Sequence, residues 1–443
     1  MRPNLPLAGV LMAGVLPVSS AQAQSQDLAQ ILLTFFSPEN PVVLVANPNP
    51  AFSHAAHFRS QAAAQGVLRQ LNAGIATQIS TFPIGSSSAG FTYTFDEGLG
   101  VYNRTTESLG PIFTERPLTA GKGKFTFGVN YQNATWDSFE GNSLGGGDLK
   151  LFLTHEDTNN NASPLNLWFE GDLIRAALRL DVETKTAVAY ANYGITERFD
   201  VSLAVPFQDV ALTANIDLEV ERVATGAASG IHQFEGGALQ STISKGGTAS
   251  GIGDVLLRGK YNFLRGSQGS LAAFVDLRLP TGDEANLLGS GATQTRFSLV
   301  AGGGIGRFSP RGSLGYTHSS GGSEFTGDLP NEIYYSAGFD LVLHPQVTVT
   351  ADFIGRTLLD AQTLGTRESV FRYTTAPNNP TVFETTRTEL VSETGNLPLL
   401  LGSAGIKINP AGRLLIVANV LFKLGDRGLQ DDVTPTFGIG YTF

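Results

Sequence analysis

Residues 254–263 read Asp-Val-Leu-Leu-Arg-Gly-Lys-Tyr-Asn-Phe, and this stretch decides the fold. Every second position is apolar or small: Val255, Leu257, Gly259, Tyr261 and Phe263. Asp254, Arg258, Lys260 and Asn262 hold the polar positions between them. A period of two is typical of a β-strand with one apolar and one polar face. Because the polar face carries full charges, the two faces are expected to meet different surroundings.

The same alternation recurs along the chain from residue 122 onward. It is clear in 125–131, 174–182, 271–279 and 414–422. In a soluble sandwich the apolar face would cover a core, whereas in a membrane barrel it would meet lipid.

The links between these stretches separate the two interpretations. Tight links such as Gly194–Arg198 and His344–Gln346 alternate with long polar ones such as 225–250 and 359–396. Alternation of short turns with long loops is typical of outer-membrane barrels. The sequence therefore predicts an all-β fold, a transmembrane, antiparallel, up-and-down β-barrel of about 12 strands, with 14 as the alternative.

The expected strands have both chain ends on the periplasmic side. They cover 122–136, 173–193, 199–224, 250–264, 270–281, 295–308, 311–319, 332–343, 346–358, 397–409, 412–425 and 433–443. Around Pro206 the apolar positions change parity, and we expect a bulge or bend there. The glycine run Gly302–Gly306 is expected inside a strand.

Composition agrees with a membrane barrel and excludes several classes of protein. Charged residues make up 15% of the 443, below the roughly 25% of soluble domains. The net charge is −10 without a basic block, which argues against nucleic acid as a partner. The chain has no Cys, and its six His form no His-x-x-x-His or His-Glu-x-x-His pair. We therefore predict no metal, no cofactor and no enzymatic activity.

The N-terminus has the features of an export signal over residues 1–23. Arg2 supplies a positive charge, Leu7–Val18 is apolar, and Ala21-Gln22-Ala23 offers a small-x-small cleavage pattern. Together with the barrel pattern of residues 122–443, this signal predicts a protein of the bacterial outer membrane.

Residues 24–121 lack the alternating pattern. Asp27 is placed to cap a short helix over 28–36, and Ser53–Ile79 is rich in Ala and Gln and expected to be partly helical. Two alternatives stay open at this point: a periplasmic helix packed under the barrel, or a plug inside the lumen.

Some of these stretches resemble a known family of outer-membrane proteins. They are Gly90–Asp96, Ser108–Arg116, Gly121–Phe125, Gly251–Phe263 and Leu277–Asp283. They are similar to the phenol-degradation meta-pathway (MetA-pathway) transporter family, and more distantly to the long-chain fatty-acid channel. The resemblance covers roughly residues 75–345. It implies passage of hydrophobic or aromatic compounds across the outer membrane, and an N-terminal plug.

The polar parity of the strands predicts charges in the lumen. The principal ones are Arg175, Arg179, Asp181, Glu183, Asp254, Arg258, Lys260, Asp276 and Arg278. Over all strands eight cations stand against nine anions, which favours a wall of paired charges over a pore selective for one sign of ion. A polar path for solute remains the alternative.

These observations predict an outer-membrane channel for passive uptake or efflux of small hydrophobic or aromatic molecules. The alternatives are a general diffusion porin and a structural barrel without transport. Candidate aromatic residues for the substrate path are Phe91, Tyr93, Phe95, Tyr102 and Phe113. Expected partners are outer-membrane lipid, the barrel-assembly machinery and a hydrophobic small molecule.

Overall fold

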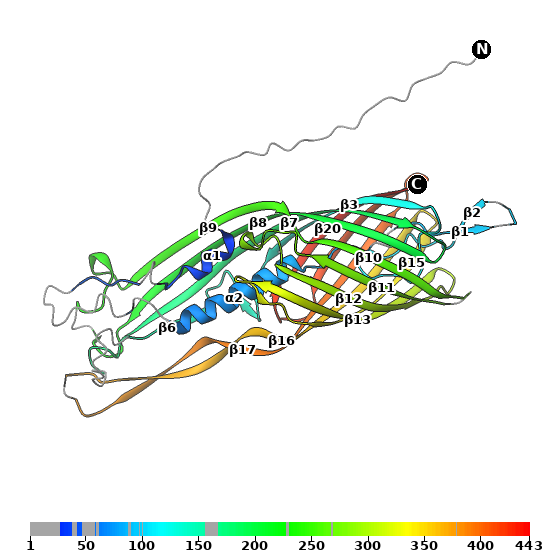
Figure 1. Cartoon of the computed structure of the whole chain (residues 1–443). Coiled ribbons are helices and arrows are strands. Elements are labelled where there is room, and N and C mark those ends of the chain that lie inside the picture. The colour runs from blue at the N-terminus through cyan, green and yellow to red at the C-terminus, as the bar shows by residue number, and fades with distance from the viewer. Residues whose placement is uncertain are drawn as a thin grey trace, which may run out of the picture.

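A computed structural model describes residues 27–37, 42–46, 58, 62–86, 90–96, 98–99, 101–155, 167–226, 230–266, 269–377 and 379–443. The proposed signal peptide, residues 1–23, lies outside these described residues. The described chain forms a closed antiparallel barrel of twelve strands with a short N-terminal helical segment, as predicted (Figure 1). The sheet closes because β7 pairs with both β3 and β8.

The barrel strands follow one another around the wall in chain order. They are β3 (Phe125–Trp136), β7 (Leu173–Gly194), β8 (Phe199–Glu221), β10 (Val255–Arg265), β11 (Ser270–Leu279), β12 (Ala292–Gly302), β13 (Phe308–Ser323), β15 (Glu332–His344), β16 (Val347–Tyr373), β17 (Phe383–Ile408), β18 (Leu414–Lys423) and β20 (Val433–Thr442). Short links join them at the end where the C-terminus and the β1–β2 hairpin lie, which is the periplasmic end of such a barrel (Figure 1).

The remaining elements lie before the barrel or at its extracellular end. They are α1 (Leu28–Leu33), α2 (Ala62–Ser80), β1 (Tyr93–Asp96), β2 (Val101–Arg104), β4 (Ser138–Phe139), β5 (Asn142–Ser143), β6 (Leu149–Leu153), β9 (Gln240–Ile252), β14 (Gly327–Asp328), β19 (Leu429–Gln430) and the 3-10 turns Glu235–Gly237 and Glu284–Asn286. In the described part of the chain, no helix is long and apolar enough to span a bilayer.

Strand β8 passes Pro206 without the predicted bulge. Its pairing with β7 runs unbroken from Leu173↔Glu221 to Gly194↔Asp200, and Pro206 pairs with Val188 in the same register. The even-numbered residues therefore face inward along the whole of both strands, and all of them are buried except the half-buried Ser202 and Ala204.

The change in apolar parity comes instead from a change of surroundings. Toward the periplasmic end, outward residues such as Leu203 and Phe207 are apolar and exposed, as lipid requires. Beyond the level of the Lys185↔Asp209 pair, the outward residues are polar, and the inward ones are apolar and buried. The outer surface passes from lipid to water at this level, while the strand keeps its orientation.

An apolar belt covers the outside of the barrel. Its exposed members include Leu203, Leu257, Phe297, Leu299, Leu314, Tyr316, Phe437, Ile439 and Tyr441. A closed sheet leaves no backbone group unpaired toward lipid, and polar residues are turned inward. The protein is thus a barrel of the bacterial outer membrane.

Three segments differ from the sequence-based expectation. β9 covers Gln240–Ile252, most of it in the expected loop 225–250, and it extends the line of β10, since both pair with β8 on the same side. β16 and β17 continue as a long hairpin into the expected loop 359–396 (Figure 1). Gly302 ends β12, so the glycine run forms a periplasmic turn and is not inside a strand. β9 and the upper part of the β16–β17 hairpin pair as strands although their polar sequence hides the alternation. The glycine run leaves the strand, because glycine weakens strand structure.

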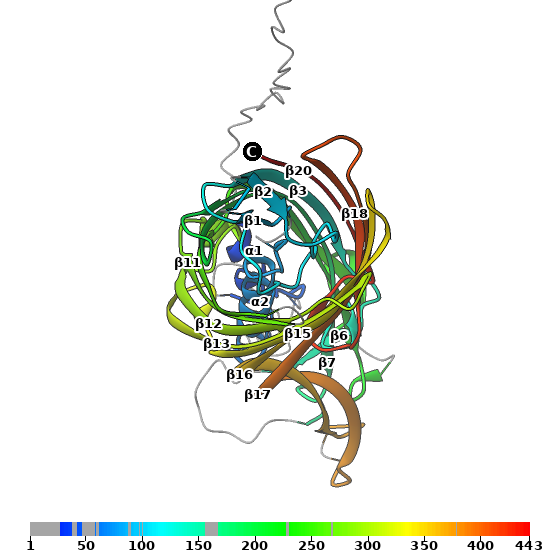
Figure 2. The same cartoon turned by 90° about the vertical axis from the view of Figure 1, so that its right-hand side faces the viewer.

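Residues 27–121 are called the N-terminal segment from here on, and their described parts lie mostly in the interior of the barrel. Viewed along the barrel, α1 and α2 lie within the ring of strands (Figure 2). α2 contacts β16, β17 and β6 from the inside. After α2 the chain passes the middle of the lumen, forms the β1–β2 hairpin at the periplasmic end, and returns into the lumen as residues 105–121.

Candidate functional site

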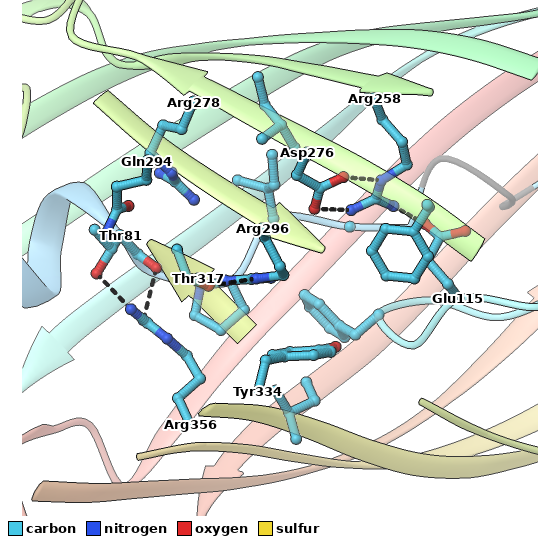
Figure 3. A pocket seen from close by; sticks show the side chains of 17 residues that line it. Thr81, Glu115, Arg258, Asp276, Arg278, Gln294, Arg296, Thr317, Tyr334 and Arg356 are labelled. Carbon is cyan, nitrogen blue, oxygen red and sulfur yellow. Dashed lines mark hydrogen bonds and ion pairs between the residues drawn. The ribbon is translucent and has the colours of Figure 1, made fainter. Parts of the chain in front are cut away.

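The middle of the lumen carries a cluster of charged side chains from neighbouring strands. Arg258 on β10 and Asp276 on β11 face each other, with Nε–Oδ1 at 2.5 Å and Nη2–Oδ2 at 2.7 Å (Figure 3). The third nitrogen of this guanidinium contacts Glu115 of the N-terminal segment. Lys260 lies 3.6 Å from the same carboxylate. The wall and the N-terminal segment therefore share one buried ion-pair network.

Two further arginines share the carboxylate of Glu332 on β15. The distances are 2.5 Å to Arg296 Nη2 and 2.6 Å to Arg356 Nη2. Glu332 is almost fully buried and also accepts a hydrogen bond from Thr317 at 2.8 Å. Arg356 Nε donates to the same carboxylate at 2.8 Å, so each oxygen of Glu332 accepts two hydrogen bonds.

The C-terminus of α2 is satisfied by arginines of the wall. Arg278 donates to the carbonyl oxygen of Ser80 at 2.7 Å, and Arg356 donates to the carbonyl oxygen of Thr81 at 2.9 Å. The last carbonyl groups of a helix have no partner within it and carry partial negative charge. These contacts fix the end of α2 at the level of the charged cluster.

The space left between these side chains is small. A cavity of about 60 Å³ lies among these side chains (Figure 3). Its lining includes Phe113, Tyr334, Ile354, Glu115, Arg258, Asp276, Arg278, Arg296 and Arg356. This volume suffices for a water molecule or two and not for an organic solute. Among the described residues, the N-terminal segment occupies the middle of the lumen and is bound to the wall there.

Below the charged cluster, the N-terminal segment is tied to the wall by a second group of charges. Arg311 on β13 lies 2.7 Å from Asp340 and 2.5 Å from Asp352. These carboxylates also accept hydrogen bonds at 2.6 Å from Ser108 and Thr114 of the N-terminal segment. Residues 105–121 are thus anchored by the same type of contact as the end of α2.

Five of the predicted lumen charges lie inside the barrel. Asp254, Lys260 and Asp276 are buried, and Arg258 and Arg278 line the central cavity. Asp254 accepts hydrogen bonds from Gly282 and Ser290 of the β11–β12 link, at 3.1 and 2.9 Å.

The other four predicted lumen charges lie on the outside, which corrects the prediction. Arg175, Arg179, Asp181 and Glu183 occupy odd positions of β7, opposite the inward positions such as Leu178. Arg175 and Arg179 pair with Glu219 and Asp217 on the outer face of β8. They lie above the lipid level, where the polar face of a strand is the outer face.

The sequence-based list missed four residues of the site: Arg296, Arg311, Glu332 and Arg356. A signal was present for Arg296, which alternates with the apolar Phe297 and Leu299, and for Arg356, which alternates with Phe353 and Gly355. Arg311 and Glu332 lie at the ends of the stretches in which apolar and polar residues alternate clearly. There the odd or even position of a residue does not indicate whether it faces the lumen.

The five predicted aromatic residues do not form one patch. Phe91 packs with Leu109, Leu415 and Tyr93, its ring centroid 6.4 Å from that of Tyr93. Phe113 belongs to a separate apolar cluster around the central cavity.

The remaining predicted aromatics belong to the β1–β2 hairpin at the periplasmic end. Phe95 pairs with Tyr102 in this hairpin, and Tyr102 is exposed. Lys124 Nζ lies over the rings of Tyr93 and Tyr102, at 4.8 and 4.3 Å from their centroids. Partial burial raises the pKa of the Tyr93 phenol, against the opposing effect of Arg413 and Arg104.

The extracellular half of the lumen has the opposite chemistry. Here α1 and α2 pack against an inner wall that is apolar on neighbouring strands, a group we call the upper cluster. Its members include Leu28, Ile31, Phe35, Leu68, Leu71, Ile75, Trp136, Phe139, Leu151, Leu178, Leu180, Leu212, Ile216 and Leu218. Barrel interiors are ordinarily polar. The upper cluster is therefore the unusual feature of this lumen.

Comparisons with known proteins add little beyond the fold. No model of a known protein family and no curated protein matches the sequence. Among solved structures, an outer membrane channel from Pseudomonas putida F1 is similar at 12% identity and a TM-score of 0.42, over 74% of this chain and 99% of that one. A FadL homologue of Pseudomonas aeruginosa is similar at 12% identity and a TM-score of 0.30, over 73% of this chain and 90% of that one. The toluene transporter TbuX of Ralstonia pickettii is similar at 10% identity and a TM-score of 0.26, over 74% of this chain and 92% of that one. At these TM-scores the likenesses carry no argument about function.

Proposed function

We propose that this protein is an outer-membrane channel for the passive movement of small hydrophobic or aromatic molecules, and that the N-terminal segment keeps it closed at rest. The observation that carries the proposal is the upper cluster. The inner wall of the upper cluster is buried against α1 and α2, and it gains an accessible apolar surface only when these helices move. An apolar solute that covers this surface gains about 25 cal/mol for each Å² buried. Neither the exclusion of water nor the conduction of ions requires an apolar inner wall.

The charged cluster supports the gating part of the proposal. Arg258, Arg278 and Arg356 hold the N-terminal segment across the middle of the lumen. A solute can pass only if this segment moves. Such a barrier also disfavours a general diffusion porin, whose lumen is a water-filled channel.

Uptake by whole cells tests this function. A Gram-negative host that expresses the full chain is expected to take up radiolabelled toluene faster than the same host without it. Leu178→Asn places an amide in the upper cluster and should reduce this uptake. Ala177→Asn, on the outer face of the same strand, is the matched control and should leave it unchanged. Equal uptake with and without the protein would contradict the proposal.

A porin and a channel for apolar solutes give different results in a parallel measurement. Uptake of a small hydrophilic solute, such as a labelled disaccharide, should not increase with the intact chain. An increase for the disaccharide alone would favour the porin, and no increase for either solute would favour a structural barrel.

The barrel-assembly machinery is the proposed partner for insertion. The last strand, β20, is followed by Phe443, whose backbone N–H donates to the carbonyl oxygen of Phe125 at 2.7 Å. Its ring centroid lies 4.9 Å from that of Tyr441. We infer that the aromatic pair on the strand that closes the barrel against β3 is what the machinery recognises before closure.

A further inference from the structure

A second and larger cavity opens at the periplasmic end of the lumen. Its volume is about 360 Å³, within the range of about 300–1,000 Å³ that small-molecule sites occupy. It lies between residues 105–118 of the N-terminal segment and the periplasmic turns after β10 and β12. We call it the periplasmic pocket. The rim at Thr105 and Gly304 is exposed, while Ser108 and Arg116 on its inner side are buried.

Arg116 is the unusual residue of this pocket. Its side chain is 6% exposed, and one nitrogen, Nη2, donates to the carbonyl oxygen of Gly90. Its Nε and Nη1 atoms have no hydrogen-bond partner within the described residues, and almost none of their surface is accessible, so a ligand reaches them only when the side chain turns toward the pocket. Among these residues Arg116 also forms no ion pair with a carboxylate. A buried cation with free N–H groups is costly unless an anion or a strong acceptor satisfies it.

The carboxylates near Arg116 are already engaged by other groups. Asp340 lines the pocket, but Arg311 and Ser108 bind its two oxygens at 2.7 and 2.6 Å. Glu115 contacts Arg258 and accepts from Ser86 at 2.8 Å. The lining as a whole carries three arginines, Arg116, Arg265 and Arg311, against two acids, Glu107 and Asp340. The pocket is thus short of negative charge beside its buried cation.

The other walls of the pocket are apolar or lack side chains. Pro117, Leu118, Pro310 and Val342 provide apolar surface, and glycines of the two periplasmic turns leave room for a ring or short chain. A Cβ added at Gly304 would meet only Ser309 Oγ, at 3.8 Å, so this wall is open. A ligand that fits these walls carries one negative charge on a small apolar body.

We propose that the periplasmic pocket binds a small aromatic or aliphatic carboxylic acid, and that the Arg116 side chain turns so that its Nε and Nη1 groups donate to the bound carboxylate. This proposal deepens the proposed function. It rests on that function only in treating the bound acid as a solute that the channel transports. It adds an anionic class of solute to the apolar one that the upper cluster favours. The carboxylate supplies the charge that Arg116 lacks, and the apolar body covers the proline and leucine surface.

Calorimetric titration of the purified full chain in detergent tests the proposal, with benzoate as the probe. Benzoate is expected to bind more tightly than its neutral analogue benzamide. Arg116→Gln should lower the affinity for benzoate about tenfold or more, since a hydrogen bond to a charged group is lost. Arg413→Gln removes an exposed charge from another periplasmic turn and should change nothing.

Two further variants keep the test decisive. If Arg116→Gln does not give a folded barrel, judged by heat-modifiable mobility on gels, Gly304→Leu narrows the pocket without touching the arginine and should also weaken benzoate binding. Arg116→Lys keeps the charge but not the planar donor and should give an intermediate affinity. Loss of binding in these variants with the Arg413→Gln control unaffected supports the proposal.

Other results overturn it. Equal affinity for benzoate and benzamide would show that charge is not recognised. Inorganic phosphate binding as tightly as benzoate would show a general anion site without a role for the apolar walls. Because binding is measured in detergent without transport, failure of toluene uptake in cells leaves this result unaffected, and the two proposals can fail separately.

Discussion

Arg258 on β10 and Glu115 of the N-terminal segment are 143 positions apart in sequence, and their side chains form a buried ion pair inside the barrel. Their side chains are 11% and 4% exposed. Asp276 holds the opposite edge of the same guanidinium, so one arginine links the wall to the segment that closes it. This link joins the folding of the barrel to the closure of its lumen.

Glu115→Gln is expected to loosen that link. It removes the negative charge that Arg258 and Lys260 share, and leaves Lys260 with Asp200 at 3.9 Å. Breaking one partner of a buried ion pair costs about 3–5 kcal/mol. The free energy of unfolding, measured by urea titration in liposomes, should fall by about this amount. Glu107→Gln, exposed at the periplasmic end, is the control and should change it by less than about 0.5 kcal/mol.

The level at which the outer surface passes from lipid to water can be tested on a single strand. Leu203 and Thr213 lie on the same outer face of β8, one below and one above the Lys185↔Asp209 pair. Leu203→Arg should destabilise the barrel by about 2–4 kcal/mol, as an arginine near the bilayer midplane does. Thr213→Arg should cost little, because water surrounds it and Asp181 lies opposite. Equal costs for the two variants, in the same titration, would show that the boundary is misplaced.

Much of the barrel could be predicted from the sequence because lipid imposes a strict alternation. Leu257 and Arg258 illustrate this, as one is exposed on the outside and the other is inside. The alternation itself does not say which face is the inner one. On β7 the residues Ile174–Val182 alternate as clearly as those of β10, yet there the apolar side is the inner side. Only the position of the membrane distinguishes the two cases.

The arrangement of the site was harder to predict, because parity does not specify partners. Arg296 and Glu332 are on β12 and β15, and they meet across β13 through the register of three strands. That register depends on link lengths that the sequence leaves uncertain, such as the turn at Gly302–Gly306. The upper part of the β16–β17 hairpin was missed for another reason. Between Thr366 and Thr388 polar and charged residues occupy both faces, and the few apolar ones, such as Val370 and Phe371, do not alternate, so the stretch has the composition of a loop.

Removal of Phe443 is expected to impair insertion of the barrel. The residue adds one backbone hydrogen bond and two aromatic contacts, with Phe125 and Tyr441, to the closing strand. The measurement is the fraction of the protein recovered in the outer-membrane fraction against the periplasm. Phe437→Leu keeps an apolar outward side chain on the same strand and should insert normally. Normal recovery without Phe443 would mean that assembly does not depend on the terminal aromatic residue.

Displacing α2 should convert the closed barrel into an open pore. Leu71 is fully buried in the upper cluster, so Leu71→Asp puts a charge where no partner is available to it and favours exit of the helix from the lumen. The barrel wall should survive, because its strands are joined by their own continuous ladders of hydrogen bonds. Single-channel conductance in planar bilayers is therefore expected to rise toward that of a chain lacking residues 24–121.

Arg69→Asp is the matched control for this experiment, since Arg69 is exposed on the same helix. It should leave the conductance low. Folding of each variant is checked by heat-modifiable mobility before the bilayer measurement. If folded Leu71→Asp conducts no better than Arg69→Asp, while the truncated chain is open, closure depends on residues 105–121 and their contacts with Arg258 and Arg311. If the truncated chain is also closed, the N-terminal segment is not the barrier, and the gating part of the proposed function fails.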